Sequence, residues 1–195
     1  MTTEPIISNI KWEEKRGWIE VITGCMFSGK TEELIRRLNR AIIARQKVEI
    51  FKPKIDNRYH EYNIVTHDLK EIRSTPVEFS SDILMLAENC HVVGIDEAQF
   101  FDEDIAQVSN TLAKKGKRVI VAGLDMDYLG SPFQNMANLL TTAEFITKMQ
   151  AICLKCGNPA NYTYRKVKSD KRFLVGEKDI YEPRCRKCFY SYSCE

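Results

Sequence analysis

The stretch that decides the fold is Gly24–Thr31, which reads GCMFSGKT and fits the phosphate-loop pattern G-x-x-x-x-G-K-[ST] at every fixed position. An apolar, strand-like segment, Trp18–Thr23, precedes it, and Glu32–Arg45 follows with apolar residues at helical spacing. In such a loop, glycines let successive backbone N–H groups face the phosphates, and the start of the next helix adds partial positive charge. A chance match is the alternative, but the strand before the loop and the helix after it argue against chance.

The polar side chains of the loop predict a nucleotide site with a metal ion. We expect Lys30 to reach the β- and γ-phosphates, and the Thr31 hydroxyl to ligate Mg²⁺ bound with ATP. A carboxylate should stand near the metal at the end of a neighbouring strand, and Asp96 follows the apolar run Val92–Ile95. The residues expected to bind ATP are Gly24, Cys25, Met26, Phe27, Ser28, Gly29, Lys30, Thr31, Asp96, Glu97, Ala98 and Gln99.

Glu97, directly after Asp96, places a second carboxylate at the same strand end. One carboxylate of such a pair can ligate magnesium while the other acts as general base on the nucleophile. The nucleophile is water in an ATPase and a substrate hydroxyl in a kinase. The residues alone leave a second interpretation open, in which Glu97 only supports the site or caps a helix.

Strands and helices alternate along most of the chain, which predicts an α/β fold with a mainly parallel sheet flanked by helices. Runs without polar interruption are typical of strands buried on both faces of such a sheet. Lys54–Ser74 is polar and reads as a long loop. The expected strands are Trp18–Thr23, Val48–Phe51, His91–Asp96 and Arg118–Gly123; the expected helices are Glu32–Arg45, a short one over Ile83–Ala87 capped by Ser80 or Ser81, and Asp102–Lys115.

Composition divides the chain into three parts. Residues 1–16 form a polar arm without the apolar centre of a secretion signal. Residues 17–148 carry the alternating strands and helices of the nucleotide-binding domain. From 149 to 195, cysteine, aromatic and basic residues become frequent and helical periodicity fades, which predicts a small second domain.

Four of the seven cysteines form two CxxC pairs, Cys153 with Cys156 and Cys185 with Cys188. Two such pairs supply four thiolates for a tetrahedral structural Zn²⁺. A redox-active CxxC is the alternative, but two matched pairs at one end of the chain favour the metal. Cys25, Cys90 and Cys194 remain, and Cys90 is expected to be a small core residue.

The spacer between the CxxC pairs mixes aromatic and basic residues over 161–182. This mixture suits single-stranded nucleic acid, but it also suits a loop that closes over a small anionic or aromatic ligand. Lys plus Arg total 29 and Asp plus Glu 27, and this near-neutral balance favours the small ligand. No apolar run is long enough to span a membrane, and the absence of a signal indicates a cytoplasmic protein.

Four features together resemble the zinc-containing (type II) thymidine kinases of bacteria, animal cytosol and poxviruses. They are the phosphate loop, the run Ile95–Phe101 (IDEAQFF), Leu124–Asp125 with Pro132–Phe133, and the two CxxC pairs. The resemblance implies a RecA-like P-loop domain with a small zinc-binding domain. It also implies transfer of the γ-phosphoryl group of ATP to the 5′-hydroxyl of thymidine, giving thymidine monophosphate.

The same resemblance implies roles for single residues. Glu97 corresponds to the family's proposed catalytic base, Lys30 to its phosphate-loop lysine, and Thr31 and Asp96 to its magnesium positions. The spacer between the CxxC pairs corresponds to a lasso loop that covers the nucleoside, while 56–59 and 66–68 match the loop after the second strand. The implied nucleoside-binding residues are Met26, Phe100, Leu124, Tyr128, Phe133, Thr163, Leu174, Val175, Gly176 and Tyr181.

The expected partners are therefore small molecules, ATP and thymidine, with thymidine triphosphate as a possible inhibitor and a homotetramer as the assembly that the family implies. No nucleic acid or membrane partner is expected. The competing function is a P-loop ATPase or zinc-ribbon protein that acts on nucleic acid. Because the phosphate loop and the cysteines lie in different domains, we expect loss of zinc to weaken thymidine binding much more than ATP binding.

Overall fold

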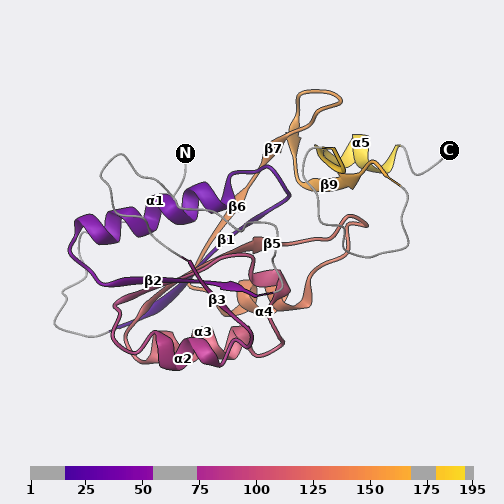
Figure 1. Ribbon diagram of the computed structural model, residues 1–195. Coiled ribbons are helices and arrows are strands. Elements are labelled where there is room, and N and C mark those ends of the chain that lie inside the picture. Colours follow the sequence, from indigo (N-terminus) through magenta and orange to yellow (C-terminus); the bar gives the residue numbers. More distant parts are fainter. Residues whose placement is uncertain (1–15, 55–73, 168–178, 192–195) are drawn as a thin grey trace.

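The computed structural model describes residues 16–54, 74–167 and 179–191. Its centre is a six-stranded sheet with the order β3-β2-β4-β5-β1-β6 (Figure 1). Every neighbouring pair in this sheet is parallel. The strands are β1 (Trp18–Gly24), β2 (Val48–Pro53), β3 (Ser74–Val77), β4 (Val92–Ile95), β5 (Arg118–Leu124) and β6 (Phe145–Met149).

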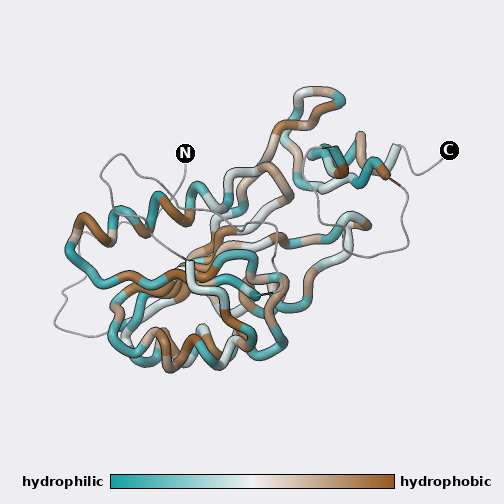
Figure 2. The backbone as a smooth tube through the Cα atoms, in the orientation of Figure 1, coloured by the Kyte–Doolittle hydropathy of each residue, from teal (hydrophilic) through white to brown (hydrophobic). Residues whose placement is uncertain are grey.

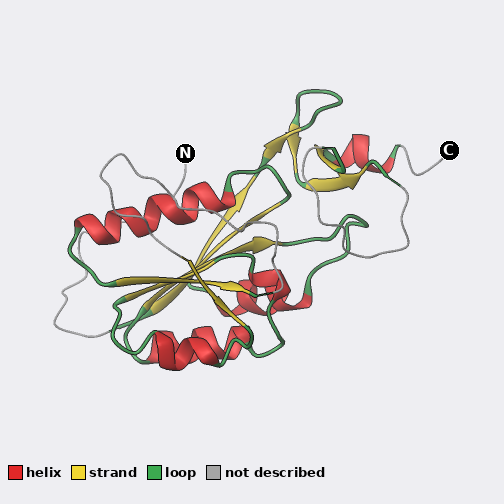
Figure 3. Cartoon of the chain, in the orientation of Figure 1, coloured by secondary structure: helices red, strands yellow, loops and turns green. Residues whose placement is uncertain are grey.

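Helices cover both faces of the sheet (Figure 3). The long helix α1 (Lys30–Ile43) lies on one face, where Leu34 and Leu38 pack against Ile22 and Ile120. The other face carries α2 (Asp82–Leu86), α3 (Ile105–Lys114) and α4 (Gln134–Thr142), with the short 3-10 helix η2 (Ala98–Phe100) near the strand ends. The most hydrophobic segments run through the sheet between these layers (Figure 2). The predicted parallel α/β fold is thus confirmed.

The structure adds elements that the sequence pattern did not reveal and corrects one detail. Helix α4 and strand β6 were not predicted, and β3 begins at Ser74, the last residue of the predicted loop. The cap of α2 is also different, because Ser81 makes no side-chain capping bond. Instead, the N–H groups of Ile83 and Leu84 in the first turn donate to the backbone oxygens of Ser80 and Ser81, and the Ser80 hydroxyl donates to Asp102 Oδ1.

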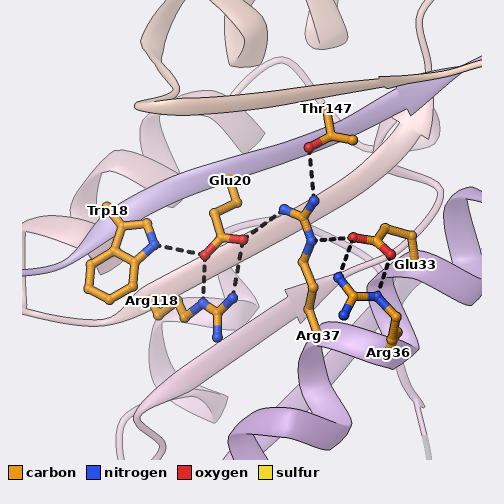
Figure 4. A network of polar contacts seen from close by, with 7 residues as sticks. All are labelled: Trp18, Glu20, Glu33, Arg36, Arg37, Arg118 and Thr147. Atoms are coloured by element: carbon orange, nitrogen blue, oxygen red, sulfur yellow. Dashed lines mark hydrogen bonds and ion pairs between the residues drawn. The ribbon is translucent and has the colours of Figure 1, made fainter. Parts of the chain in front are cut away.

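A buried ion network lies between α1 and the sheet (Figure 4). Glu20 on β1 accepts from Arg37 Nη1 at 2.8 Å and from Arg118 Nε at 2.6 Å. Arg37 Nε also donates to Glu33 on the same helix at 2.8 Å, and Arg37 Nη2 donates to Thr147 on β6 at 2.8 Å. One arginine therefore connects helix α1 to two strands. We call Trp18, Glu20, Glu33, Arg36, Arg37, Arg118 and Thr147 the buried ion network.

The C-terminal unit begins directly after the edge strand β6, with only Gln150 between β6 and β7. It consists of two small antiparallel pairs, β7 with β8 and β9 with β10, followed by a short helix. Tyr162 stacks on Phe189 of that helix with ring centroids 4.6 Å apart. The elements are β7 (Ala151–Ile152), β8 (Pro159–Ala160), β9 (Tyr162–Arg165), β10 (Tyr181–Arg184) and α5 (Arg186–Tyr190).

Candidate active site

The predicted phosphate loop joins the end of β1 to the start of α1, at the carboxyl edge of the sheet. Two of its glycines have backbone angles that other residues rarely adopt, with φ of 146° at Gly24 and 84° at Gly29. At Gly24 a Cβ atom would also lie 2.3 Å from the carbonyl oxygen of Met149. The loop thus needs glycine for its turn and for its close approach to β6.

Lys30 and Thr31 begin the helix after the loop. Lys30 Nζ donates to the carbonyl oxygen of Cys25 at 2.8 Å. Burial lowers the pKa of the Lys30 ammonium, and the nearby carboxylates, first that of Glu97, act in the opposite direction. The Thr31 hydroxyl donates to Asp96 Oδ2 at 3.2 Å. The structure thus brings together the hydroxyl and the carboxylate that were predicted to share a magnesium ion.

Asp96 and Glu97 follow β4 and lie opposite the phosphate loop. Burial and then the neighbouring Glu97 charge raise the pKa of Asp96 to about 7. The backbone N–H of Glu97 donates to Asp96 Oδ1 at 2.9 Å, and Glu97 has left-handed backbone angles, with φ of 52° and ψ of 40°. A non-glycine residue in this region carries strain, which is common at functional sites. Two close carboxylates, with the pKa of Asp96 raised by burial and by the neighbouring charge, are a suitable site for a divalent cation.

Gln99 orients the Glu97 carboxylate. Its Oε1 accepts from the backbone N–H of Leu124 at 2.9 Å, which leaves its Nε2 group to donate to Glu97 Oε2. Only the amide oxygen can accept from an N–H, so the bond to Leu124 fixes which end of the amide faces Glu97. Ala98, between them, packs in the hydrophobic core. The side chain of Ala98 therefore contacts the core, and that of Gln99 hydrogen-bonds Glu97 and Leu124.

Several residues predicted to line a nucleoside pocket lie around this edge. Phe100 and Phe133 meet edge to face, with ring centroids 6.3 Å apart. The backbone N–H of Met26 donates to Thr163 Oγ1 at 3.0 Å. The Arg165 guanidinium lies 3.5 Å from the ring centroid of Tyr128. The phosphate loop and strand β9 are thus in contact through Met26 and Thr163, two residues of the predicted base pocket.

The four cysteines of the CxxC pairs converge in the C-terminal unit. Their Sγ atoms all lie within 4.8 Å of one another, and Cys156 Sγ lies 3.6 Å from Cys185 Sγ. Four thiolates at about 2.3 Å from one zinc ion are about 3.8 Å apart in a tetrahedron. Cys153 and Cys185 are buried, and hydrogen bonds from Asn158 lower the pKa of Cys156 to about 6. Cys153, Cys156, Cys185 and Cys188 therefore fit the tetrahedral zinc site that the sequence predicted.

Comparisons with known proteins identify the family of the chain. A sequence model of the family described as "Thymidine kinase" matches residues 17–189. The chain belongs to the thymidine kinase family. A protein named thymidine kinase from Rhodothermus sp. (strain ITI 518) is 54% identical over 97% of this chain and 88% of its own length. Proteins of the same name from Bacteroides thetaiotaomicron and Porphyromonas gingivalis (strain W83) are each 54% identical, over 93% and 90% of this chain and 91% and 86% of their own lengths.

Some predicted residues of this thymidine kinase family member lie outside the described residues. They are Leu174, Val175 and Gly176 of the predicted lasso loop, the segments 56–59 and 66–68, and residues 1–15 of the arm. Tyr181, at the other end of the predicted loop, begins β10 opposite Arg165 and is buried. Among the described ranges, no helix has the length and apolar composition that a membrane crossing requires.

Asp125 is a site-edge residue to which sequence reasoning gave no role. It follows β5 and is 7% exposed, and neither of its carboxylate oxygens has a hydrogen-bond partner of good geometry in the described part of the chain. Lys148 Nζ on β6 lies 2.8 Å from Oδ2, so this ion pair spans the end of β1. An Asp that follows an apolar strand was the signal used for Asp96, and the same signal marks Asp125.

Proposed function

We propose that this protein is a thymidine kinase that transfers the γ-phosphoryl group of ATP to the 5′-hydroxyl of thymidine, forming thymidine monophosphate for nucleotide salvage. The observation that carries the proposal is the arrangement of Lys30, Thr31, Asp96 and Glu97 around one strand edge, in a chain of the thymidine kinase family. The names of the relatives support thymidine as the nucleoside.

The roles in phosphoryl transfer follow from the positions of these groups. The backbone of the loop and Lys30 bind the phosphates, while the Thr31 hydroxyl and Asp96 would hold the Mg²⁺ that accompanies ATP, which would offset phosphate charge. Glu97 accepts the proton of the 5′-hydroxyl as that oxygen attacks the γ-phosphorus. Gln99 keeps the Glu97 carboxylate turned toward the site, because its own amide is fixed by Leu124.

The nucleoside is proposed to bind beside the phosphate loop, against the C-terminal unit. Phe100, Phe133 and Tyr128 supply aromatic surface, and Thr163 contacts the loop itself. Met26, Leu124 and Tyr181, together with Leu174, Val175 and Gly176 of the lasso loop, complete the proposed set. A structural Zn²⁺ on the four cysteines would fix both ends of the lasso loop.

The direct test is formation of thymidine monophosphate from thymidine and ATP, measured by chromatography with and without Mg²⁺. Glu97→Gln keeps the size of the side chain but removes the base, so kcat should fall by about 10²- to 10⁴-fold. The fall should lie near the lower value, because a loose transition state leaves the hydroxyl proton in place until late.

Glu103→Gln is the matched control, because Glu103 is an exposed glutamate beyond the site. It should leave kcat unchanged. The proposal fails if no thymidine monophosphate forms, or if ATP hydrolysis responds to an oligonucleotide and not to thymidine. An unchanged kcat in Glu97→Gln, measured when chemistry is rate-limiting, would remove the base role alone.

Assembly, regulation and location are proposed from the family. The protein is expected to be a homotetramer, inhibited by thymidine triphosphate, and to work in the cytoplasm, where reduced thiols are available for zinc. Light scattering at micromolar protein and inhibition of the kinase assay by thymidine triphosphate test the first two. A monomer, or full activity at saturating triphosphate, would contradict them.

A further inference from the structure

One peptide group of the phosphate loop has partners on both of its sides. The carbonyl oxygen of Cys25 accepts from Lys30 Nζ at 2.8 Å and from the Ser28 hydroxyl at 2.8 Å. In the same peptide group, the N–H of Met26 donates to Thr163 Oγ1 at 3.0 Å. The cation of the phosphate site and the C-terminal unit are therefore bonded to the two ends of one peptide.

The Cys25 side chain makes a second bond to the C-terminal unit, because its thiol donates to the carbonyl oxygen of Ala160 at 3.3 Å. The thiol is 1% exposed and packs with Ala151, Cys153 and Cys185 in one cluster. Water cannot replace a partner in such a dry place, so losing this bond costs more than losing an exposed one.

The two bonds reach both halves of the cysteine cluster. Ala160 lies on β8, which pairs with β7, the strand directly before Cys153. Thr163 lies on β9, which pairs with β10, the strand directly before Cys185. Each CxxC pair is thus linked to the Cys25–Met26 peptide through one pair of strands. If the cysteines of either pair become less ordered, the effect can reach the peptide through those strands.

We propose that the Cys25–Met26 peptide, through Cys25 and Thr163 as positioning residues, couples nucleotide binding to metal retention by the cysteine cluster. The inference rests on the proposed nucleotide and zinc sites and goes beyond them. When phosphates bind, the Lys30 ammonium donates to them, and its hydrogen bond to the Cys25 carbonyl oxygen is lost. The bonds to Ala160 and Thr163 then keep the peptide in place.

Zinc binding and nucleotide binding are expected to strengthen each other. With zinc bound, the strands that carry Ala160 and Thr163 are fixed, so the loop is already ordered when nucleotide arrives. Without zinc these strands loosen, and the loop must be ordered at the cost of binding energy. Nucleotide should therefore tighten zinc binding and slow zinc loss, and zinc should tighten nucleotide binding. The two affinities change by the same factor, because coupling between two ligands is reciprocal.

This inference changes one expectation drawn from the sequence. The sequence placed the phosphate loop and the cysteines in different domains and therefore predicted that zinc loss affects thymidine much more than ATP. The contacts of Cys25 and Met26 predict that nucleotide affinity also falls when zinc is lost.

The test measures the rate at which zinc passes from the loaded protein to a chromophoric chelator, with and without saturating MgADP and without thymidine. MgADP binding is first measured directly with a fluorescent ADP analogue. We expect MgADP to slow zinc release about fivefold, a value at the lower end of measured couplings. The dissociation constant of MgADP should also rise in protein stripped of zinc, by the factor by which MgADP lowers the dissociation constant of zinc.

Variants assign the effect to the two bonds. Cys25→Ala and Thr163→Val each remove one bond and should bring the ratio of release rates close to one. Cys25→Ser replaces the thiol donor with a hydroxyl donor, and Thr163→Ser keeps the accepting hydroxyl, so both should retain most of the ratio. Cys90→Ala is the matched control, because Cys90 is a buried thiol that also donates to a carbonyl, that of Ala87 at 3.2 Å, but outside this contact.

The outcomes separate this proposal from the proposed function. Equal zinc release with and without MgADP in the wild type, or an unchanged ratio in both Cys25→Ala and Thr163→Val, overturns the coupling while kinase activity stands. A wild type that does not bind MgADP overturns both. A ratio lost in Cys90→Ala as well would mean that general destabilisation, and not the Cys25–Met26 peptide, controls zinc release.

Discussion

Carboxylates gather at two places in the sheet, one under α1 and one at the end of β4, and they are partnered in different ways. In the buried ion network under α1, both oxygens of Glu20 accept from arginines, and both oxygens of Glu33 do the same (Figure 4). At the carboxyl edge, Asp96 and Glu97 lie beside each other, and the pKa of Asp96 is raised to about 7.

This difference in partners indicates that the first group of carboxylates stabilises the fold and that the second is available to bind a cation or a proton. A carboxylate whose two oxygens both accept from arginines has its charge balanced by those arginines. Two carboxylates placed beside each other repel, and a bound cation or a proton on one of them reduces that repulsion. The two places therefore predict different responses to substitution.

The largest effect is expected from Arg37→Met, which keeps the aliphatic part of the side chain but removes the guanidinium shared by Glu20, Glu33 and Thr147. Breaking a buried ion pair on one side typically costs about 3–5 kcal/mol. The free energy of unfolding from urea titration should fall by about this amount, while kcat of the folded fraction changes little.

The double variant Glu20→Gln/Arg37→Met serves as its control. It removes a charge from each side and should recover part of the lost stability. If Arg37→Met unfolds at the wild-type urea concentration, the network contributes no stability and the comparison is wrong.

Lys30→Ala should give the opposite pattern. Removing one preorganised donor to a transition-state charge typically lowers kcat by about 10²- to 10³-fold. Folding should be little affected, because the ammonium donates to a carbonyl oxygen of the loop, that of Cys25, and not to a buried carboxylate. Circular dichroism melts and steady-state kinetics on the same samples check both halves; a large loss of stability with near-native turnover would reverse the assignment.

A smaller effect is expected on the free energy of unfolding at acidic pH. Hydrogen bonds from Arg36, partly offset by burial, and then those from Arg37 lower the pKa of Glu33 below its ordinary value. A lowered pKa in the folded state stabilises the protein above the unfolded pKa of about 4.3, and this contribution is lost as pH falls through the folded value. Urea titrations at pH 7 and near pH 4 should show a steeper loss in the wild type than in Glu33→Gln. Equal slopes would contradict the prediction.

The smallest effect is expected at Lys54–Glu78, an ion pair with side chains 68% and 63% exposed and atoms 3.4 Å apart. Solvent-exposed pairs contribute about 0–1 kcal/mol. Lys54→Ala should therefore leave the urea midpoint nearly unchanged, and any remaining effect should shrink in high salt. A loss comparable to that in Arg37→Met would show that burial is not what distinguishes the network.

Much of the site was predictable because its residues are close in sequence. The phosphate loop is one continuous motif, Asp96 and Glu97 end a recognisable apolar strand, and each CxxC pair is a local pattern. The four cysteines and the Thr31–Asp96 contact came together as expected.

What the sequence did not reveal depends on distant contacts. Strand β6 is an edge strand with exposed Phe145 and Ile146, so it lacks the continuous apolar run of a buried strand. The bond between Cys25 and Ala160 joins residues 135 positions apart, and no local pattern encodes it. Ser81 makes no side-chain cap, because the N–H groups of Ile83 and Leu84 donate to the backbone oxygens of Ser80 and Ser81.

The position of β1 in the sheet has a consequence for folding during synthesis. β1 is made early, but both of its neighbours come late, since Trp18 pairs with Arg118 and Glu20 with Phe145. At about 5–20 residues per second, the ribosome needs about 5–20 s to make the chain between β1 and β5. During that time both edges of β1 are unpaired, and such edges invite aggregation. The predicted phosphate loop is thus made well before β5 and β6, the two strands that pair with β1 and complete the sheet around it.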